Sequence, residues 1–121
     1  MAVKFLLVFA GGGLGAIARY FVTTALAGRL GNFPLGTLTV NLLGSFLMGL
    51  AVGIIAGRAS LEPLRLLLAA GFLGGFTTFS SFSAETLALI QGGQIFSAAA
   101  NVLVSVAAGL AACAAGLSLA R

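Results

Sequence analysis

The distribution of charge constrains this chain more than any other feature of its sequence. Only eight of its 121 residues are charged, and they leave three long uncharged stretches at 30–57, 66–84 and 86–120. In a fourth stretch, 5–28, the one charged residue is Arg19. A helix that crosses a bilayer needs about 20 consecutive, mostly apolar residues. We therefore predict an all-α integral membrane protein with four transmembrane helices, near residues 4–27, 35–57, 65–90 and 95–119.

Composition supports this class and excludes others. Hydrophobic residues make up 60% of the chain and charged residues 7%, whereas soluble domains contain about 25% charged residues. So few charges cannot cover a water-soluble globule, which excludes most soluble enzymes. The six basic residues are scattered and form no phosphate-tracking patch, so we expect no nucleic-acid partner. At this length we expect one domain, a four-helix membrane unit covering residues 1–121.

Cysteine and histidine usage narrows the possible sites. The chain has no histidine, and its single cysteine, Cys113, cannot form an intrachain disulfide. A zinc or haem site is therefore not expected. The polar residues that lie within the apolar stretches remain as the candidates for function.

Glycines recur at a spacing of four residues along three of the four stretches. The series are Gly11 and Gly15, then Gly49, Gly53 and Gly57, then Gly71 and Gly75. No hydrophobic force drives helices together in lipid, so close packing relies on small residues at this spacing. We interpret most of these glycines as helix–helix contacts.

Four spans place both ends of the chain on the same side of the membrane. The basic residues on that side are Lys4, Arg58, Arg65 and Arg121. The opposite side carries Arg29, and Arg19 lies within the first span. By the positive-inside rule, this distribution favours termini in the cytoplasm and a multi-pass protein of the cytoplasmic (inner) membrane.

Two features of the first 30 residues imitate unrelated motifs. Lys4, the apolar run that follows and Ala25-Leu26-Ala27 resemble a cleaved signal peptide, but Arg19 lies late in that run and the rest of the chain is equally apolar. The glycine run 11–15 resembles a dinucleotide-binding turn, which requires an acidic residue about 20 positions later. None follows before Arg58, and no lysine completes a phosphate-binding loop. We predict that the protein is not an enzyme.

The most informative polar segment lies in the middle of the third span. It reads Gly-Gly-Phe-Thr-Thr-Phe-Ser-Ser-Phe-Ser over residues 74–83 and is followed by Glu85. Two glycines and two β-branched threonines form helix poorly, so the helix either breaks here or is kinked by hydroxyls that bond to the previous turn. Broken helices within membranes are tolerated where freed backbone groups are buried or bind something, and exposed carbonyls commonly hold a cation.

After this segment, phenyl rings alternate with hydroxyl groups. Phe79 and Phe82 are three residues apart, and the polar residues that follow helical steps beside them are Thr78, Ser81 and Glu85. A phenyl ring has a positive edge, so ring edges with hydroxyl and amide hydrogens between them suit a small anion. The alternative is that the rings fill a core.

Polar residues in the other three spans could complete such a site. Asn41 offers two donors and an acceptor to an ion, or else links helices. In the fourth span, residues four apart form one narrow face, which contains Asn101, Ser105, Gly109 and Cys113. Arg19 must reach the interface, pair, or give positive potential to a water-filled vestibule.

Taken together, these residues resemble the CrcB/Fluc family of fluoride channels. The matching stretches are GGGLGAIARY at 11–20, PLGTLTVNLLG at 34–44 and GFLGGFTTFSSFSAE at 71–85. The resemblance implies an antiparallel, dual-topology homodimer with two fluoride pores along the subunit interface. It also implies a structural sodium ion at the dimer centre, held by the backbone carbonyls of Gly74 and Thr77 from both subunits.

The resemblance also implies roles for single residues. Arg19 matches the vestibule arginine of the family. The positions that match its fluoride pathway are Asn41, Thr78, Phe79, Ser81, Phe82, Glu85 and Ser105. The implied function is passive, fluoride-selective conduction that lets a cell lose accumulated fluoride.

Two departures from the family pattern and two rival functions accompany this hypothesis. Gly109 stands where the fourth helix often has a second hydroxyl, and the charge bias is larger than dual insertion favours. The first rival is a proton-coupled exporter of the small multidrug type, which needs a carboxylate in the first helix, where this chain has Arg19. The second is a non-conducting assembly subunit whose glycine faces serve packing alone.

Overall fold

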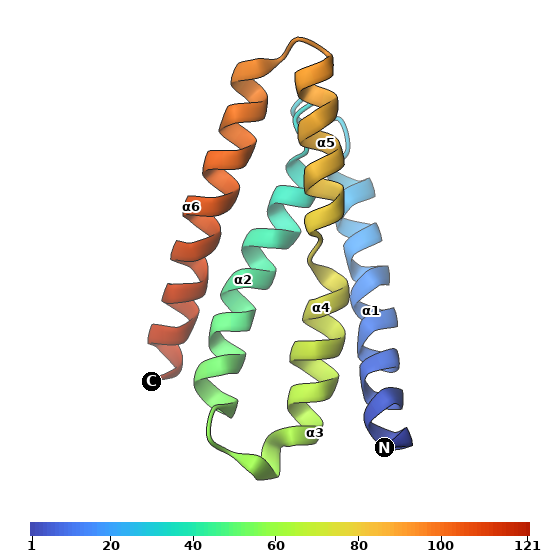
Figure 1. Ribbon diagram of the computed structural model, residues 1–121, viewed down its shortest axis with the longest axis vertical. Helices are drawn as coiled ribbons and strands as arrows, with labels where there is room; N and C mark the ends of the chain where they lie inside the picture. The colour runs from blue at the N-terminus through green and yellow to red at the C-terminus, as the bar shows by residue number, and fades with distance from the viewer.

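The computed structural model describes residues 1–121 and contains helices and connecting turns but no strand. Four helical segments are long and apolar enough to cross a membrane, which confirms the sequence prediction. They are α1 (Ala2–Leu26), α2 (Leu35–Ile55), a third span over Ala59–Gln91, and α6 (Ile95–Ala120). The four run side by side, and both termini lie at the same end of the bundle (Figure 1).

The third span is assembled from several short pieces. In chain order they are η1 (Ala59–Leu61), α3 (Glu62–Leu64), η2 (Arg65–Leu73), α4 (Gly74–Phe76) and α5 (Phe79–Gln91). The span begins before the expected residue 65 because the first turn of α3 accommodates a proline, which lacks a donor that would otherwise be unpaired there. The η2 segment is wound as a π-helix, which the sequence analysis did not anticipate.

Between α4 and α5 the third span is broken. Thr77 has φ −89° and ψ 157°, and Thr78 has φ −152° and ψ 118°, so both residues are extended. Of the two possibilities that the sequence left open, the structure has the break and not the kink. The break lies directly after the Gly-Gly-Phe turn of α4, at the two β-branched residues.

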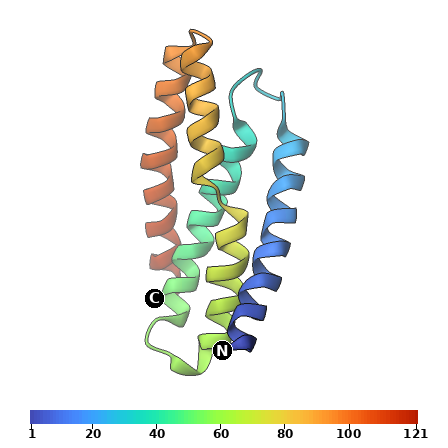
Figure 2. The ribbon, with the colours of Figure 1, turned by 45° about the vertical axis from the view of Figure 1, so that its right-hand side comes forward.

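The break transfers the third span from one neighbour to another. Before the break, η2 and α4 pack on α1, whereas α5 packs on α6. Figures 1 and 2 show the same change of neighbour in two views. Helix α2 packs along α6 and makes fewer contacts with α1 and η2. The break is therefore the point at which the third span stops packing on α1 and begins to pack on α6.

Most of the glycines spaced by four are helix contacts, as predicted. Gly11 and Gly15 are buried, and a Cβ atom on either would collide with a backbone carbonyl of η2, that of Leu67 or Phe72. A Cβ on Gly49 would likewise collide with the carbonyl of Cys113 on α6. Backbones therefore lie directly against one another along both interfaces, as small residues permit in lipid.

Gly57 is the exception to that interpretation. It has φ +74°, a left-handed conformation that favours glycine, and a Cβ added to it would meet no atom within 4 Å. It follows the end of α2, which therefore stops at Ile55 and does not continue to residue 57. Gly57 thus supports a chain reversal and makes no contact between helices.

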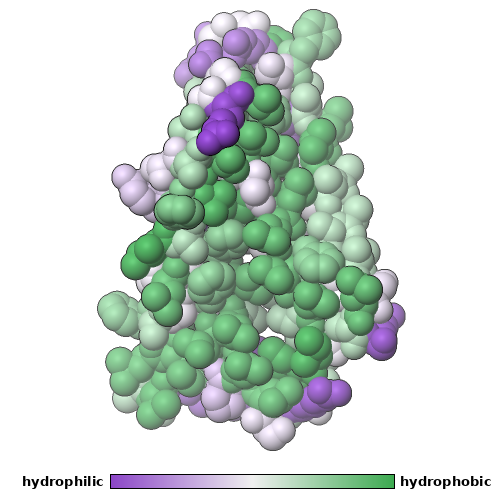
Figure 3. All heavy atoms as spheres, turned by 180° about the vertical axis from the view of Figure 1, so that it is seen from behind, coloured by the Kyte–Doolittle hydropathy of each residue, from purple (hydrophilic) through white to green (hydrophobic).

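The outside of the bundle has the character of a lipid-facing surface. Large apolar side chains are exposed along all four spans, among them Phe9, Phe21, Phe96 and Leu110. Figure 3 shows a face that is mostly hydrophobic, with hydrophilic residues gathered mainly toward the two ends. A water-soluble protein rarely exposes a continuous apolar surface of this extent.

Candidate functional site

The break is held in place by one side chain of α2. The Asn41 amide donates through Nδ2 to the carbonyl of Thr78 at 3.0 Å, and its Oδ1 accepts the Thr78 backbone N–H at 2.8 Å. Asn41 thus satisfies both backbone groups of an extended residue, as a neighbouring strand would. This contact is the interhelical link that the sequence left as one of two roles for Asn41, and the second amide hydrogen is still available.

The other backbone groups at the break fall into two sets. Arg19 donates through Nε to the carbonyl of Gly75 at 2.9 Å, and the backbone N–H and the hydroxyl of Thr77 both donate to Leu73. The carbonyls of Gly74 and Thr77 receive no hydrogen bond from the chain. Two carbonyl oxygens close together in sequence are therefore free to accept from another partner or to bind a cation.

A groove of about 350 Å³ lies beside the break. The residues that line it come from α2, the break, α5 and α6, and they include Asn41, Ser45, Met48, Thr77, Thr78, Phe79, Phe82, Ser105 and Cys113. Five of the seven side chains assigned to the fluoride pathway by resemblance lie in this one groove. They come from three separate spans, so the fold and not the sequence spacing brings them together.

The two phenyl rings of the groove are neighbours that tilt relative to one another. The ring centroids of Phe79 and Phe82 are 5.6 Å apart and their planes differ by 41°. Phe79 is 78% exposed although it lines the groove. The groove is consequently walled by this chain on one side and open on the other.

A second cavity of about 300 Å³ lies near the turn that joins α1 to α2. Its polar lining includes Arg19, Thr37, Ser81 and Glu85. The Thr37 hydroxyl donates to Oε1 of Glu85 at 2.6 Å, a hydrogen bond between α2 and α5. Arg19 and Glu85 share the cavity without forming an ion pair.

A short chain of hydrogen bonds connects α5 to α6 next to the groove. Asn101 is 1% exposed and donates through Nδ2 to Thr86 Oγ1 at 2.9 Å. The Thr86 hydroxyl in turn donates to the carbonyl of Phe82 at 2.7 Å. On the other side, Ser105 donates to Asn101 Oδ1 at 3.4 Å. Asn101 therefore links the backbone that carries one ring to the hydroxyl that faces the groove.

The structure separates some of the residues that the sequence analysis grouped. Ser81 and Glu85 lie in the Arg19 cavity and not among the lining of the groove. Thr78 precedes α5, and its hydroxyl accepts the backbone N–H of Ser81 at 3.2 Å, so it caps the helix. Ser80 is exposed and its hydroxyl contacts that of Thr78.

Sequence reasoning missed two partners of these residues. Thr86 was not singled out, although a threonine four residues after Phe82 marks a polar position on the same face of α5. Thr37 lies in the second of the matching stretches but was given no role of its own, and its hydrogen bond to Glu85 joins two helices. The signal available in the sequence was that each threonine is a polar residue within a mostly apolar stretch.

Comparison with known proteins gives one consistent result. Residues 6–117 match the family described as CrcB-like protein, Camphor Resistance (CrcB). A protein of Solibacter usitatus named fluoride-specific ion channel FluC is 48% identical over 98% of this chain and 99% of its own length. Proteins with the same name in Coxiella burnetii and Granulibacter bethesdensis are 52% and 46% identical, over 84% and 98% of this chain and 85% and 95% of theirs.

These matches cover the whole bundle, including the broken third span and the residues of the groove. Four apolar helices long enough to cross a bilayer make the chain a multi-pass protein of the cell membrane. The chain belongs to the CrcB family.

Proposed function

We propose that this chain forms a fluoride-selective channel that exports fluoride passively across the cell membrane. The observation that carries the proposal is the groove at the break, where Asn41, Phe79, Phe82 and Ser105 converge from three spans. The name shared by relatives at 46–52% identity supports the same function. The proposal therefore combines a polar, ring-lined groove inside a membrane span with the ion that those relatives conduct.

The chemistry of the groove suits a small, strongly hydrated anion. Such an ion crosses the membrane only if protein donors replace its water molecules. Asn41 keeps one N–H after bonding to Thr78, and phenyl rings offer positive edges. The Ser105 hydroxyl is bonded to Asn101 at the long distance of 3.4 Å, so it can turn toward the groove at little cost.

We propose that the working unit is an antiparallel homodimer. A ring that is 78% exposed cannot by itself enclose an ion, so the groove needs a second wall. A second copy of the chain in the opposite orientation supplies that wall for both grooves at once, which gives two pores in each dimer. The excess of basic residues at the end with the termini is the feature that opposes dual insertion.

The sodium ion implied by the family fits the residues at the break. The carbonyl oxygens of Gly74 and Thr77 receive no hydrogen bond from the chain, and carbonyls of an unwound helix are typical sodium ligands. A bound cation would supply fixed positive charge beside the groove. We expect exchange into a large organic cation, with sodium removal verified, to lower fluoride efflux, and unchanged efflux would contradict a functional sodium site.

Arg19 and Glu85 define the proposed vestibule at one end of the pathway. Arg19 uses Nε for the Gly75 carbonyl, which leaves the rest of its guanidinium free in the cavity that it lines. A fixed positive charge in a narrow cavity raises the local concentration of anions. Glu85, which accepts a hydrogen bond from Thr37, also lines that cavity.

The decisive experiment measures fluoride efflux from proteoliposomes with a fluoride electrode, with chloride efflux measured in parallel. We expect rapid fluoride release and negligible chloride release. The double variant F79I/F82I should abolish fluoride release while the protein remains folded. The matched control is F5I/F9I, which changes two exposed phenylalanines of α1 and should conduct normally.

Other outcomes would favour the rival functions. Efflux that requires a proton gradient would favour a coupled exporter of the small multidrug type. No fluoride release from folded, dimeric protein would favour an assembly subunit. Normal fluoride release by F79I/F82I would show that the pathway does not pass the two rings.

A further inference from the structure

A further cavity lies outside the sites described so far. It has a volume of about 690 Å³ and lies between α2 and η2, at the end of the bundle that carries the termini. Its apolar wall is formed on α2 by Met48, Ala51, Val52 and Ile55. Its charged lining consists of Arg58, Glu62 and Arg65.

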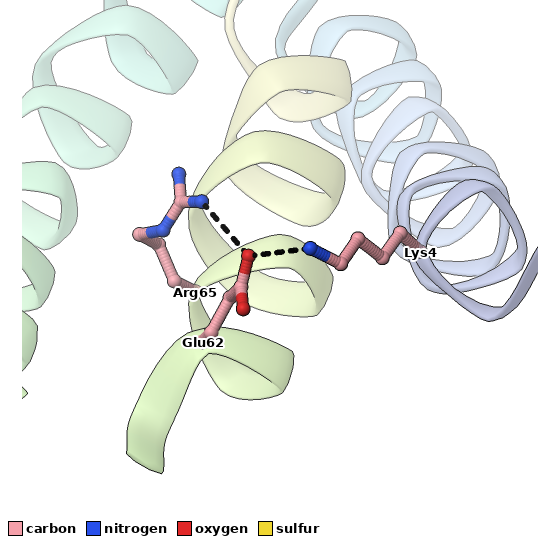
Figure 4. Close-up of polar contacts among 3 residues, drawn as sticks. All are labelled: Lys4, Glu62 and Arg65. Atoms are coloured by element: carbon pink, nitrogen blue, oxygen red, sulfur yellow. Dashed lines mark hydrogen bonds and ion pairs between the residues drawn. The ribbon is translucent and has the colours of Figure 1, made fainter. Parts of the chain in front are cut away.

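Glu62, the single carboxylate in this lining, forms an ion pair with a lysine that does not line the cavity. Glu62 Oε1 lies 3.0 Å from Lys4 Nζ and 3.9 Å from the nearest Arg65 nitrogen. Figure 4 shows Lys4 and Arg65 on opposite sides of Glu62. Lys4 does not line the cavity, and Arg58 makes no ion pair. The cavity is thus lined by two arginines and by one glutamate, whose carboxylate lies closer to a lysine outside the lining than to Arg65.

The cavity and the groove share one lining residue. Met48 lines both of them. On α2, Ser45 lies one turn before Met48 and lines the groove, whereas Val52 lies one turn after it and lines the cavity. The groove and the cavity therefore follow one another along α2 on either side of Met48, and the arginines in the cavity lining outnumber its one carboxylate.

We propose that this cavity is a second mouth of the permeation pathway, which gathers small inorganic anions at the end opposite the Arg19 cavity. Arg58 and Arg65 attract the anion, Glu62 opposes them, and Met48 forms the throat between the mouth and the groove. This inference rests on the proposed channel function. It assigns to this chain two arginines that act on the rate of fluoride permeation without contacting the rings.

Electrostatics fixes the sign and size of the expected effects. A unit charge about 10 Å from an ion in water changes the local ion concentration about twofold. The Debye length is about 30 Å at 0.01 M ionic strength and about 3 Å at 1 M, so high salt should remove the effect. The carboxylate and the two arginines must act in opposite directions.

The experiment measures initial fluoride efflux in zwitterionic phosphatidylcholine vesicles at low and high concentrations of an impermeant salt. At low salt we expect R58Q and R65Q each to lower efflux about twofold and E62Q to raise it about twofold. The matched control is R121Q, which removes the same charge at the same end from a residue outside the cavity. At high salt all four variants should equal the wild type.

A second pair of variants tests the throat independently of charge. Met48→Phe should lower efflux at both salt concentrations, whereas Leu43→Phe, on an exposed position of the same helix, should not. If R58Q, R65Q and E62Q gave the same efflux as R121Q, the proposal that this cavity is a mouth of the pathway would be wrong. The proposal would also be wrong if these variants changed efflux only in vesicles of anionic lipid, because that result would indicate a site for a lipid headgroup. In both cases wild-type efflux would persist, whereas its absence would instead refute the channel function.

Discussion

The two halves of the third span are held in contrasting ways. Before the break, η2 and α4 pack against α1 with backbone touching backbone at Gly11 and Gly15. After the break, α5 is joined to its neighbours by polar contacts, from Asn101 to Thr86 and from Thr37 to Glu85. The first half is closely packed on the side that faces α1, whereas the second half borders both the groove and the Arg19 cavity.

This contrast separates stability from conduction along a single helix. In lipid, tight association requires small residues that let helices approach closely. A pathway for an ion requires the opposite, helices that stand apart and polar side chains that line the space. The break allows one span to meet both requirements, because it moves the chain from α1 to α6 midway through the membrane.

The largest expected effect comes from filling the tight interface. A Cβ on Gly15 would collide with the Phe72 carbonyl and approach the Phe76 nitrogen at 2.9 Å, and backbone cannot move aside as a flexible side chain can. Overpacking typically costs about 1–3 kcal/mol, and we expect Gly15→Val to reach at least the upper end of that range. Little monodisperse protein should survive size-exclusion chromatography in detergent.

The control for this variant lies two residues away on the same helix. Gly13 is exposed, and a Cβ added to it meets no atom within 4 Å. Gly13→Val should therefore purify as the wild type does. Equal recovery of the two variants would show that the α1 interface does not depend on close approach of backbones.

A smaller but still large effect is expected at the break itself. Asn41→Leu leaves the backbone N–H and carbonyl of Thr78 without partners. A fully buried group without a partner costs about 1–3 kcal/mol, and these two half-buried groups should cost somewhat less each, which is enough for the break to lose its fixed geometry. We expect a lower thermal midpoint and loss of fluoride efflux together.

Thr39→Val is the matched control for that loss. Thr39 is on the same helix and half-buried, but its hydroxyl donates to the carbonyl of Leu35 within α2. It should therefore change neither the thermal midpoint nor efflux by much. A stable, conducting Asn41→Leu protein would show that the break is maintained without this side chain.

The polar link between α5 and α6 should contribute less. Interhelical hydrogen bonds in membranes average about 0.6 kcal/mol and reach about 1.7 kcal/mol. We expect Asn101→Leu and Thr86→Val each to lower stability by an amount in that range. The double variant should cost less than the sum, because both remove the same bond. Additive losses in reversible unfolding experiments would contradict a direct contact.

The fold was predictable where the signal lies in one continuous stretch of the sequence. Uncharged stretches of about 20 residues mark membrane spans whatever their neighbours are. The break was predictable only as one of two outcomes, because Gly74, Gly75, Thr77 and Thr78 weaken a helix without determining how the chain resolves that weakness. The same composition fits a kink.

The assignment of residues to the groove or the Arg19 cavity was not predictable from spacing. Helical periodicity relates side chains only within one continuous helix. Two extended residues, Thr77 and Thr78, interrupt the helix before α5, and the π-helical turns of η2 shift the angle between residues that precede it. Ser81 therefore faces a cavity with Arg19 that no count of residues across the break could have identified.

The smallest expected effect concerns Gly109, which stands where the fourth helix of the family often has a second hydroxyl. Gly109 lies on α6 between Ser105 and Cys113, which both line the groove, and a Cβ added to it would meet only Ser45 Oγ, at 3.8 Å. Gly109→Ser therefore fits without strain and gives the groove another donor. A hydrogen bond is worth about 0.5–1.5 kcal/mol net, which corresponds to a change in efflux of about twofold to tenfold. Gly109→Ala, which adds the Cβ without the hydroxyl, should leave efflux unchanged. If both variants changed efflux equally, the effect would come from helix rigidity, and the groove would not respond to a donor at this position.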